Sequence, residues 1–519
     1  MFSYDAVPYP SKFFLQTHPD RLAAAGVLYG MVPALPQTCR VLELGCGNGS
    51  NLVAHAFGLP DAEFVGVDLS ATHIDKAKLS AEELSLSNVT FAKMDVTEMS
   101  ESDFGRFDYI TAHGLFAWVP DFVRDSVLRL FGELLEPSGI GYVSYNAYPG
   151  AHTREMVRSI MRFHTRSVDE PQAKVERAIS FLKLLAENAA EQETYRAAFR
   201  TELERHQQHS LEDIYHDDLG EFYRPFYFHE FAGLLAANGM QFLSEAELHA
   251  STLQGLSEEA VAFVRSIDDI VEREQYLDFL RGRVFRQTLF CRKGIELNRD
   301  PRPEILDKLF LSSTIAPVDP ITNIADASVE KFRTTKGQQM QIDHPLTKAA
   351  LVHLGEIWGR SISTPELLDA AQNIVESSGN DSDDWQKERG ITRSILMKLI
   401  LDSDMVELHA YSPDANTKAG VRPKVNRLSH WQLRDCSNVL TLFNKDLKLN
   451  DDLARQLILL MDGTRTKMKL TTDMQSFVRT KKDIEGKQEL IREMASWIDE
   501  SLVELARLGV FVANADQPG

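Results

Sequence analysis

The stretch Cys39–Leu52, CRVLELGCGNGSNL, decides the fold. It joins a short apolar run, Arg40–Leu44, to a cluster of glycines, and a helical pattern over Asn51–Gly58 follows. A Gly-x-Gly-x-Gly turn after a strand lets the backbone approach a ligand without clashes from Cβ atoms. Taken alone, such a loop is weak evidence, because it also occurs as a tight turn or as the pyrophosphate site of a dinucleotide-binding fold.

The first 150 residues alternate strand-like apolar runs with amphipathic helical segments. Nearly continuous apolar strands in such an alternation are typical of a parallel sheet covered by helices on both faces. Pro137–Gly139 is predicted to form a turn before the fifth strand. The predicted strands are Arg40–Leu44, Phe64–Asp68, Val89–Ala92, Phe107–Ala112 and Gly139–Tyr145, and the predicted helices are Asn51–Gly58, Ser70–Leu84 and Phe122–Leu135.

In the remainder of the chain, the composition and the predicted secondary structure change twice. From about Thr153 to Asp213 it is rich in Ala, Glu, Arg and Leu, which predicts a helical insert. The sheet is then predicted to resume with a helix over His229–Asn238, capped by Gly239, and with strands beginning at Met240 and Val284. After about Asn298, helical segments that end in brief strands favour winged-helix-like modules. Five helices are predicted there, over Thr347–Trp358, Ser363–Ser377, Thr392–Leu401, Asp451–Met461 and Gln488–Leu508.

These patterns predict an α/β fold. We expect a Rossmann-like, seven-stranded sheet with a helical insert, followed by a mainly helical C-terminal region with winged-helix-like modules. The expected division is residues 1–150 for the cofactor-binding core, 151–222 for the insert, 223–297 for the end of the sheet, and 298–519 for a substrate or interaction region.

Composition excludes several classes of protein. The chain has 519 residues, 43% of them hydrophobic and 25% charged, which is ordinary for a globular protein of several domains. Its net charge of -20 argues against binding of nucleic acid phosphates. The 4 cysteines show no metal-ligand spacing, so we expect no metal site and a reducing compartment. With no signal peptide and no membrane-spanning run in sight, we expect a cytoplasmic protein.

Acidic residues near the ends of three predicted strands narrow the choice of ligand. Glu43 precedes the glycines, Asp68 ends the second strand, where a carboxylate can accept from ribose hydroxyls, and Asp95 follows the third. Three acids around a nucleoside fit a ligand with a positive charge and no phosphate, which describes S-adenosylmethionine. NAD is the second choice, because the glycine spacing does not match GxGxxG.

At this point a family resemblance can be stated. The chain resembles class I S-adenosylmethionine-dependent methyltransferases, and within them the bacterial enzymes with a methyltransferase regulatory domain. These include rickettsial protein-lysine methyltransferases that modify outer-membrane proteins. The resemblance spans nearly the whole chain and is weakest over the insert. It rests on SYDAVPYPSKFFLQTHPDRLA, CRVLELGCGNGSNL, FVGVDLS, FDYITAHGLFAWVP, YVSYNAYPGAH, YFHEFAGLLAANGMQFLSEAEL, EQYLDFLRGRVFRQTLFCRKG and LLMDGTRT.

The resemblance implies S-adenosylmethionine as the cofactor and a role for particular residues. Glu43 and the glycines would cradle the methionine half, Asp68 the ribose and Asp95 the adenine. His113, Gly114 and Leu115 follow the fourth strand, where the cofactor would meet the substrate. The residues predicted to bind the cofactor are Glu43, Gly45, Cys46, Gly47, Gly49, Asp68, Leu69, Asp95, His113 and Gly114.

Five residues are candidates for the methyl-transfer step, each with an alternative. Asn146 would accept from the substrate amine, or cap a turn, and Tyr145 beside it would line the transfer channel. Trp118 would stack on adenine or lysine, or fill the core. His113 is either a cofactor contact or a satisfied core histidine. Asp217 or Asp218 would hold the ammonium and His216 would receive its proton, or the three residues form a solvated helix end.

Two further segments suggest cover for the site. The N-terminal segment with Tyr4, Tyr9 and Ser11 is either a lid over the cofactor or a strap on the surface. Aromatic residues follow the insert and are either core or a tunnel for an alkyl-ammonium side chain. They are Phe222, Tyr223, Phe226, Tyr227 and Phe228.

The expected activity is methylation of lysine amines in a protein substrate by in-line displacement. A buried amine near a sulfonium loses its proton more readily, so no strong base is required and positioning is the main task. The alternatives are a methyltransferase for a small-molecule acceptor and a cofactor-binding regulatory protein. We also expect a homodimer formed through the insert.

Overall fold

The computed structural model describes Val7 and residues 12–188, 193–321, 323–380, 382–413, 418–434, 438–449, 451–481 and 486–511. The chain forms two compact units. The first holds Met1–Leu22 and Met31–Leu297, and the second holds Ala23–Gly30 and Asn298–Gly519. Helix α2, Pro19–Leu28, therefore contributes residues to both units.

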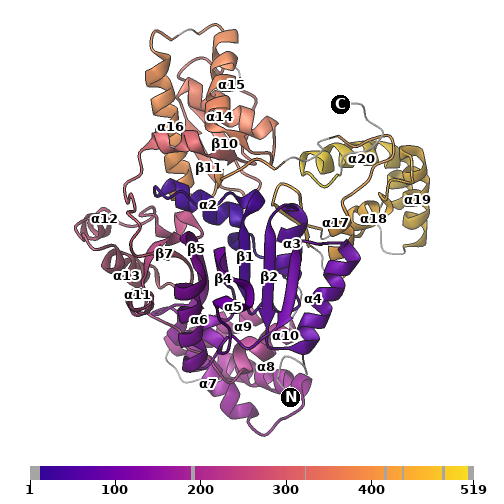
Figure 1. The fold of residues 1–519 in the computed structure, drawn as a ribbon. Coiled ribbons are helices and arrows are strands. Elements are labelled where there is room, and N and C mark those ends of the chain that lie inside the picture. The colour runs from indigo at the N-terminus through magenta and orange to yellow at the C-terminus, as the bar shows by residue number, and fades with distance from the viewer. Residues whose placement is uncertain are drawn as a thin grey trace. The chain divides into compact units, whose positions relative to one another are not determined.

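A seven-stranded sheet organises the first unit, in the order β3-β2-β1-β4-β5-β7-β6 (Figure 1). All neighbours are parallel except that β7 runs antiparallel to both β5 and β6. This confirms the predicted Rossmann-like sheet whose last two strands follow the insert. The strands are β1 Arg40–Leu44, β2 Glu63–Asp68, β3 Val89–Lys93, β4 Phe107–Ala112, β5 Leu135–Asn146, β6 Met240–Glu245 and β7 Phe285–Arg292.

The fifth strand begins earlier than the sequence predicted. Phe107 of β4 pairs with Leu135, and Tyr109 pairs with Ile140, so the register shifts between the two pairs. The prediction that Pro137–Gly139 is a turn before the strand is wrong: these residues form an irregularity inside β5. Pro lacks the N–H that a ladder needs, which accounts for the register shift at this position.

Helices cover the sheet and also form the insert between β5 and β6. The predicted insert is confirmed as four helices with a core of their own, which includes Val157, Leu182, Phe199 and Ile214. The insert helices are α7 Ala151–Thr165, α8 Pro171–Asn188, α9 Glu193–His206 and α10 Leu211–Leu219. The other helices of this unit are α3 Ser50–Gly58, α4 Ala71–Leu84, α5 Glu101–Phe104, α6 Asp121–Leu134, α11 Phe228–Ala237, α12 Glu258–Arg265 and α13 Ile270–Arg281.

The second unit combines helices with short strands. The hairpin of β14, Asn438–Leu440, and β15, Asp446–Lys448, lies among helices, as in a winged helix. Helix α16 starts at Trp385, seven residues before the predicted helix, because Asp384 caps it by accepting from the Lys387 N–H. Helices α17 and α19 were not predicted. The helices are α14 Pro345–Glu356, α15 Thr364–Ser377, α16 Trp385–Asp402, α17 Arg427–Gln432, α18 Asp452–Leu460, α19 Lys467–Thr480 and α20 Lys487–Arg507.

The remaining strands of the second unit form two small sheets. They are β8 Phe310–Ser312 with β12 Ile362–Ser363 and β13 Glu407–His409, and β9 Ala316–Pro317 with β10 Glu330–Arg333 and β11 Gln339–Ile342.

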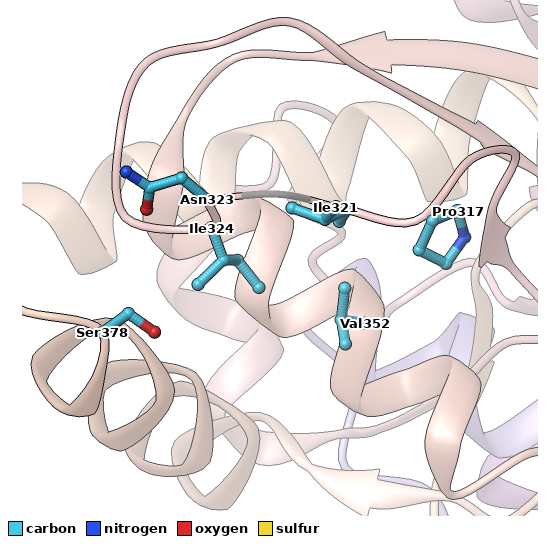
Figure 2. A pocket seen from close by; sticks show the side chains of 6 residues that line it. All are labelled: Pro317, Ile321, Asn323, Ile324, Val352 and Ser378. Atoms are coloured by element: carbon cyan, nitrogen blue, oxygen red, sulfur yellow. The ribbon is translucent and has the colours of Figure 1, made fainter.

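A pocket of ≈ 600 Å³ lies in this second unit (Figure 2). Figure 2 shows a loop with Pro317, Ile321, Asn323 and Ile324 lying over Val352 of α14. Its lining carries no titratable side chain, so it offers no chemistry for catalysis. Across the described part of the chain, the helices are too short or too polar to cross a bilayer.

Candidate active site

The glycine loop after β1 is held against the end of β2 by backbone hydrogen bonds. The N–H groups of Gly45 and Cys46 both donate to the Val67 carbonyl, at 2.9 and 3.0 Å. The N–H of Gly47 donates to Asp68 Oδ2 at 2.9 Å. The predicted glycine loop and the predicted acid at the end of β2 are therefore one connected structure at the carboxyl edge of the sheet.

The glycines of this loop have different surroundings. All three have positive φ, at 72° for Gly45, 54° for Gly47 and 76° for Gly49. A Cβ on Gly49 would lie 2.6 Å from Ala77 Cβ, so Gly49 allows α4 to pack closely. A Cβ on Gly47 would meet no atom within 4 Å. The described residues thus leave space over Gly47, whereas they close in on Gly49.

Glu43 sits under the loop in a buried polar network that the sequence did not predict. Its side chain is 4% exposed, and Oε1 accepts from Asn51 Nδ2 at 2.7 Å. Its other oxygen, Oε2, is buried and has no hydrogen-bond partner among the described residues. Burial raises the pKa of Glu43 to about 7, an effect that the Asn51 hydrogen bond opposes and the charge of Asp68 reinforces.

Two more predicted acids follow the neighbouring strands. Asp68 Oδ1 accepts from the Ser70 N–H at 2.9 Å, so both of its oxygens are held by loop N–H groups. Each carboxylate oxygen keeps a further lone pair for a ligand. Leu69 beside it is 41% exposed. Asp95, after β3, accepts from the Thr97 N–H at 2.9 Å. Because β1, β2 and β3 are neighbours in the sheet, Glu43, Asp68 and Asp95 lie along one edge.

The loop after β4 brings His113 and Gly114 to the same edge. His113 Nδ1 is 2.8 Å from the Tyr142 hydroxyl, and its ring stacks on Phe14 with centroids 3.7 Å apart. Burial, with a contribution from the charge of Lys12, lowers the pKa of His113 to about 3, so the ring is neutral. Gly114 donates its N–H to Ser144 Oγ at 2.9 Å, and an added Cβ there would meet nothing within 4 Å.

The two predicted residues at the end of β5 face opposite sides of the sheet, since side chains alternate along a strand. Asn146 is 6% exposed, and its Oδ1 is buried without a partner among the described residues. Tyr145 packs on Phe231, with centroids 4.3 Å apart, and its hydroxyl lies 3.4 Å from Thr288 Oγ1. The structure places Tyr145 in the hydrophobic core, whereas the sequence suggested a channel wall.

Trp118 and Asp217 belong to a separate cluster between the sheet and the insert. The guanidinium groups of Arg154 and Arg158 lie 5.5 and 5.3 Å from the Trp118 ring, and Tyr223 packs beside it at 5.0 Å. Asp217 Oδ2 is 3.6 Å from Arg154 Nη2. Burial raises the pKa of Asp217, against the charge of Arg154. The Trp118 ring thus contacts two arginine side chains of the protein itself, which does not favour stacking on a ligand.

The aromatic residues after the insert divide between core and surface. Phe226 and Phe228 are buried, whereas Phe222 is 44% exposed. Tyr227 packs against Tyr148, with centroids 5.1 Å apart. They do not all lie together, so this cluster as a whole does not form one tunnel.

The predicted lid falls partly outside the described residues: Tyr4, Tyr9 and Ser11 are not among them. The adjacent residues Lys12–Thr17 are described and cross the site. Phe14 stacks on His113, and Lys12 Nζ is 2.7 Å from Asp213 Oδ1 of α10. Gln16 Nε2 donates to Glu247 Oε1 at 2.7 Å. His216 Nε2 lies 2.6 Å from the Val7 carbonyl oxygen.

Asn51, Phe14 and Thr17 are the site residues that sequence reasoning missed. The available signal for Asn51 was a polar side chain in the largely apolar helix SNLVAHAFG. Its partners Phe14 and Thr17 lie more than 30 residues away, so these contacts required the fold.

Known proteins share this arrangement. The family model described as "Methyltransferase domain" matches residues 36–203. "Predicted methyltransferase regulatory domain" matches residues 211–292, and "PKMT, C-terminal winged helix domain" matches residues 422–510. An uncharacterised protein of Rickettsia prowazekii is 30% identical over 384 residues, 72% of this chain and 69% of that protein. A second one from the same organism is 35% identical over 44% of this chain and 92% of its own length.

A solved structure agrees over almost the entire length. PKMT2 from Rickettsia typhi, in complex with AdoHcy, has a TM-score of 0.87 and 25% identity, and the match covers 98% of this chain and 100% of that one. The resemblance that the sequence motifs indicated is confirmed. The chain belongs to the class I S-adenosylmethionine-dependent methyltransferases that carry a methyltransferase regulatory domain and the PKMT C-terminal winged helix domain.

Proposed function

We propose that this methyltransferase transfers methyl groups to lysine side-chain amines of a protein substrate. The observation that carries the proposal is the match to PKMT2, which extends through the regulatory and winged-helix parts as well as the sheet. Residues 298–519 would then form the substrate or interaction region. A small-molecule enzyme with the same sheet has no need for these parts.

The residues at the carboxyl edge of the sheet fit S-adenosylmethionine. Glu43 Oε2 is a buried acceptor without a described partner, which suits the cationic methionine half. Open space over Gly47 and Gly114 allows close approach of a ligand to the backbone. Asp68 is oriented by two loop N–H groups and would accept from the ribose, and Asp95 with Leu69 would border the adenine. When bound, S-adenosylmethionine supplies a methyl group on a positively charged sulfur.

The acceptor amine would lie between Asn146 and His113. Asn146 Oδ1, at the end of β5, is a buried acceptor with no partner among the described residues, and it would orient the amine through one N–H. Phe285 pairs with Asn146 across strands β5 and β7. Its ring centroid lies 6.4 Å from that of His113, so the Phe285 ring adds an apolar wall. An amine in such surroundings loses its proton more easily than in water, because burial disfavours its charged form. The protein therefore acts by positioning, with the released proton passing to water.

The test uses purified protein and S-adenosylmethionine labelled in the methyl group. Membrane and soluble protein fractions of the host organism are added separately, and labelled residues are located by mass spectrometry. We expect label on lysines with the wild type, none with Asp68→Ala, and strongly reduced label with Asn146→Ala although that variant still binds cofactor. Label confined to small molecules would overturn the proposal, and undiminished turnover by Asn146→Ala would overturn the placement of the amine.

Two finer proposals accompany this one. The first is that the substrate is an outer-membrane protein, which the membrane fraction in the same experiment tests.

The second is a homodimer formed through the insert. Exposed apolar side chains on the insert support it, with Phe163 at 68%, Leu184 at 52% and Leu211 at 42% exposure. Light scattering at micromolar concentration should give twice the chain mass, and Phe163→Ser with Leu184→Ser should give the monomer.

We also keep the cytoplasm as the proposed location. The buried Cys39 and Cys46 carry thiols outside any disulfide, which suits a reducing compartment. Fractionation of host cells, followed by immunoblotting, tests it, and recovery outside the cytoplasmic fraction would overturn it.

A further inference from the structure

The side-chain amide of Asn51 uses both of its N–H donors and its oxygen to join two parts of the site. Its Oδ1 accepts from the Phe14 N–H at 2.8 Å. Its Nδ2 donates to Thr17 Oγ1 at 3.0 Å and to Glu43 Oε1 at 2.7 Å. The Thr17 hydroxyl in turn donates to the Phe14 carbonyl at 2.8 Å. A flipped amide would set an NH₂ group against the Phe14 N–H, so the orientation of Asn51 is unique.

One side of this junction is the cofactor cradle. Glu43 is the buried acid below the glycine loop, and Asn51 is its hydrogen-bond partner. Asn51 stands in the first turn of α3, which starts directly after Gly49, so helix and loop hold the amide in place. A cation against Glu43 Oε2 would favour the carboxylate form, and that form accepts a stronger hydrogen bond from Asn51 than the neutral acid does.

The other side of the junction is the segment Lys12–Thr17, which reaches the acceptor side. Phe14 covers the ring of His113, and Lys12 forms an ion pair with Asp213 of the insert. Asn51 binds this segment twice, through the Phe14 N–H and the Thr17 hydroxyl. Release of these two hydrogen bonds would free Phe14 to leave His113.

We propose that Asn51 is a positioning residue that couples occupation of the cofactor cradle at Glu43 to closure of Lys12–Thr17 over His113. The coupling rests on the proposed function only in taking S-adenosylmethionine and its product as ligands of the cradle. Through this coupling, cofactor binding would place Lys12–Thr17, with Phe14 over His113, as one wall of the acceptor site. Asn51 itself touches neither reacting group.

Tryptic cleavage after Lys12 measures closure independently of catalysis. S-adenosylhomocysteine should protect the Lys12–Phe13 bond in the wild type in proportion to its occupancy, measured by calorimetry. In Asn51→Ala, affinity at pH 7.5 should fall roughly tenfold or more, because a charged hydrogen bond is lost. In this variant, trypsin should cleave the Lys12–Phe13 bond as fast at saturating S-adenosylhomocysteine as without ligand. Equal protection of Asn51→Ala at saturation would overturn the coupling.

The pH profile separates positioning from simple loss of structure. The Asn51 hydrogen bond lowers the pKa of Glu43, so Asn51→Ala should move the pH midpoint of ligand binding upward. The titratable groups facing Glu43 are Asp68, which is common to both proteins, and Cys46, whose thiol pKa is raised well above its ordinary value by burial. An unchanged midpoint would overturn the assignment.

Thr17→Val is the matched control, because it removes one of the two hydrogen bonds between Asn51 and the segment while leaving the Asn51–Glu43 hydrogen bond. It should weaken protection of Lys12 and leave the pH midpoint of binding where it is in the wild type. Circular dichroism and thermal melting verify that each variant is folded. If wild-type protein bound neither S-adenosylmethionine nor S-adenosylhomocysteine, the proposed function itself would fail, which is a different result from binding without protection.

Discussion

Two buried clusters of charged side chains lie within one unit of this protein, and they differ in how completely they are paired. Beside β7, Arg286 is 1% exposed and surrounded by three carboxylates, with Glu245 at 2.7 Å, Asp278 at 2.8 Å and Glu274 at 3.1 Å. Glu245 also accepts from Thr288 and from the Gln287 N–H. At the carboxyl edge of the sheet, Glu43 has one oxygen bound and the other without a described partner.

The difference separates a structural cluster from a binding site. Burial of a charge costs several kcal/mol unless hydrogen bonds and an opposite charge offset it. Around Arg286 each of the three carboxylates has a cationic partner within the chain, and Asp278 also binds Arg283. At Glu43 one carboxylate oxygen has no partner among the described residues. A buried acid that lacks its counter-charge indicates where a cationic ligand belongs.

The largest effect should come from the paired cluster. Arg286→Met leaves three buried carboxylates without their common partner and should lower the free energy of unfolding by about 3–5 kcal/mol. Chemical denaturation monitored by circular dichroism measures it. A loss below about 1 kcal/mol would mean that the cluster is hydrated and that the contrast with Glu43 does not hold.

Next come the two glycines that differ in surroundings. Gly49→Ala forces a Cβ to within 2.6 Å of Ala77 Cβ and should cost about 1–3 kcal/mol of stability beyond the strain of positive φ. Gly47→Ala carries similar strain but meets no atom, so it should melt at a higher temperature than Gly49→Ala. Calorimetry should show that Gly47→Ala has nevertheless lost most of its affinity for S-adenosylhomocysteine. The comparison breaks if both variants lose the same stability.

A smaller effect concerns pH. Protonated Glu43 has no charge for a cation, so affinity for S-adenosylmethionine should rise as pH increases through about 7, and Glu43→Gln should flatten this rise. The free energy of unfolding should change with pH in the opposite direction to the affinity. Because folding raises the pKa of Glu43, ligand-free protein loses stability as pH rises from the ordinary carboxyl range to about 7, and Glu43→Gln removes that loss. Calorimetric titrations and melting curves between pH 5.5 and pH 8.5 measure both.

The smallest effect should come from Tyr145. Its hydroxyl makes a single long hydrogen bond, at 3.4 Å, so Tyr145→Phe should change the free energy of unfolding by less than about 1 kcal/mol. Turnover should stay within about twofold of the wild type, unlike that of Asn146→Ala one residue further along β5. A large loss of turnover in Tyr145→Phe would restore this residue to the site.

The sequence predicted the sheet because its strands are short apolar runs that end at chemically distinctive residues. Arg40–Leu44 ends at the glycine loop, and the acids at or near the ends of β1, β2 and β3 could be placed on one edge from the parallel topology alone. The Asn51 junction could not be predicted, since its meaning lies in contacts with Phe14 and Thr17. The residues of the Arg286 cluster come from β6, β7 and α13, so no local sequence pattern predicts the cluster.

The position of the insert has a consequence for biosynthesis. Strand β5 ends at Asn146, yet its partner β7 begins only at Phe285, after the insert and β6. On the ribosome, β5 therefore emerges with an unpaired edge and keeps it until residue 292 has been made. The insert, whose core is its own, can condense in the meantime. Closing the sheet then requires pairing across a long loop, which is slow and leaves the edge exposed to other nascent chains.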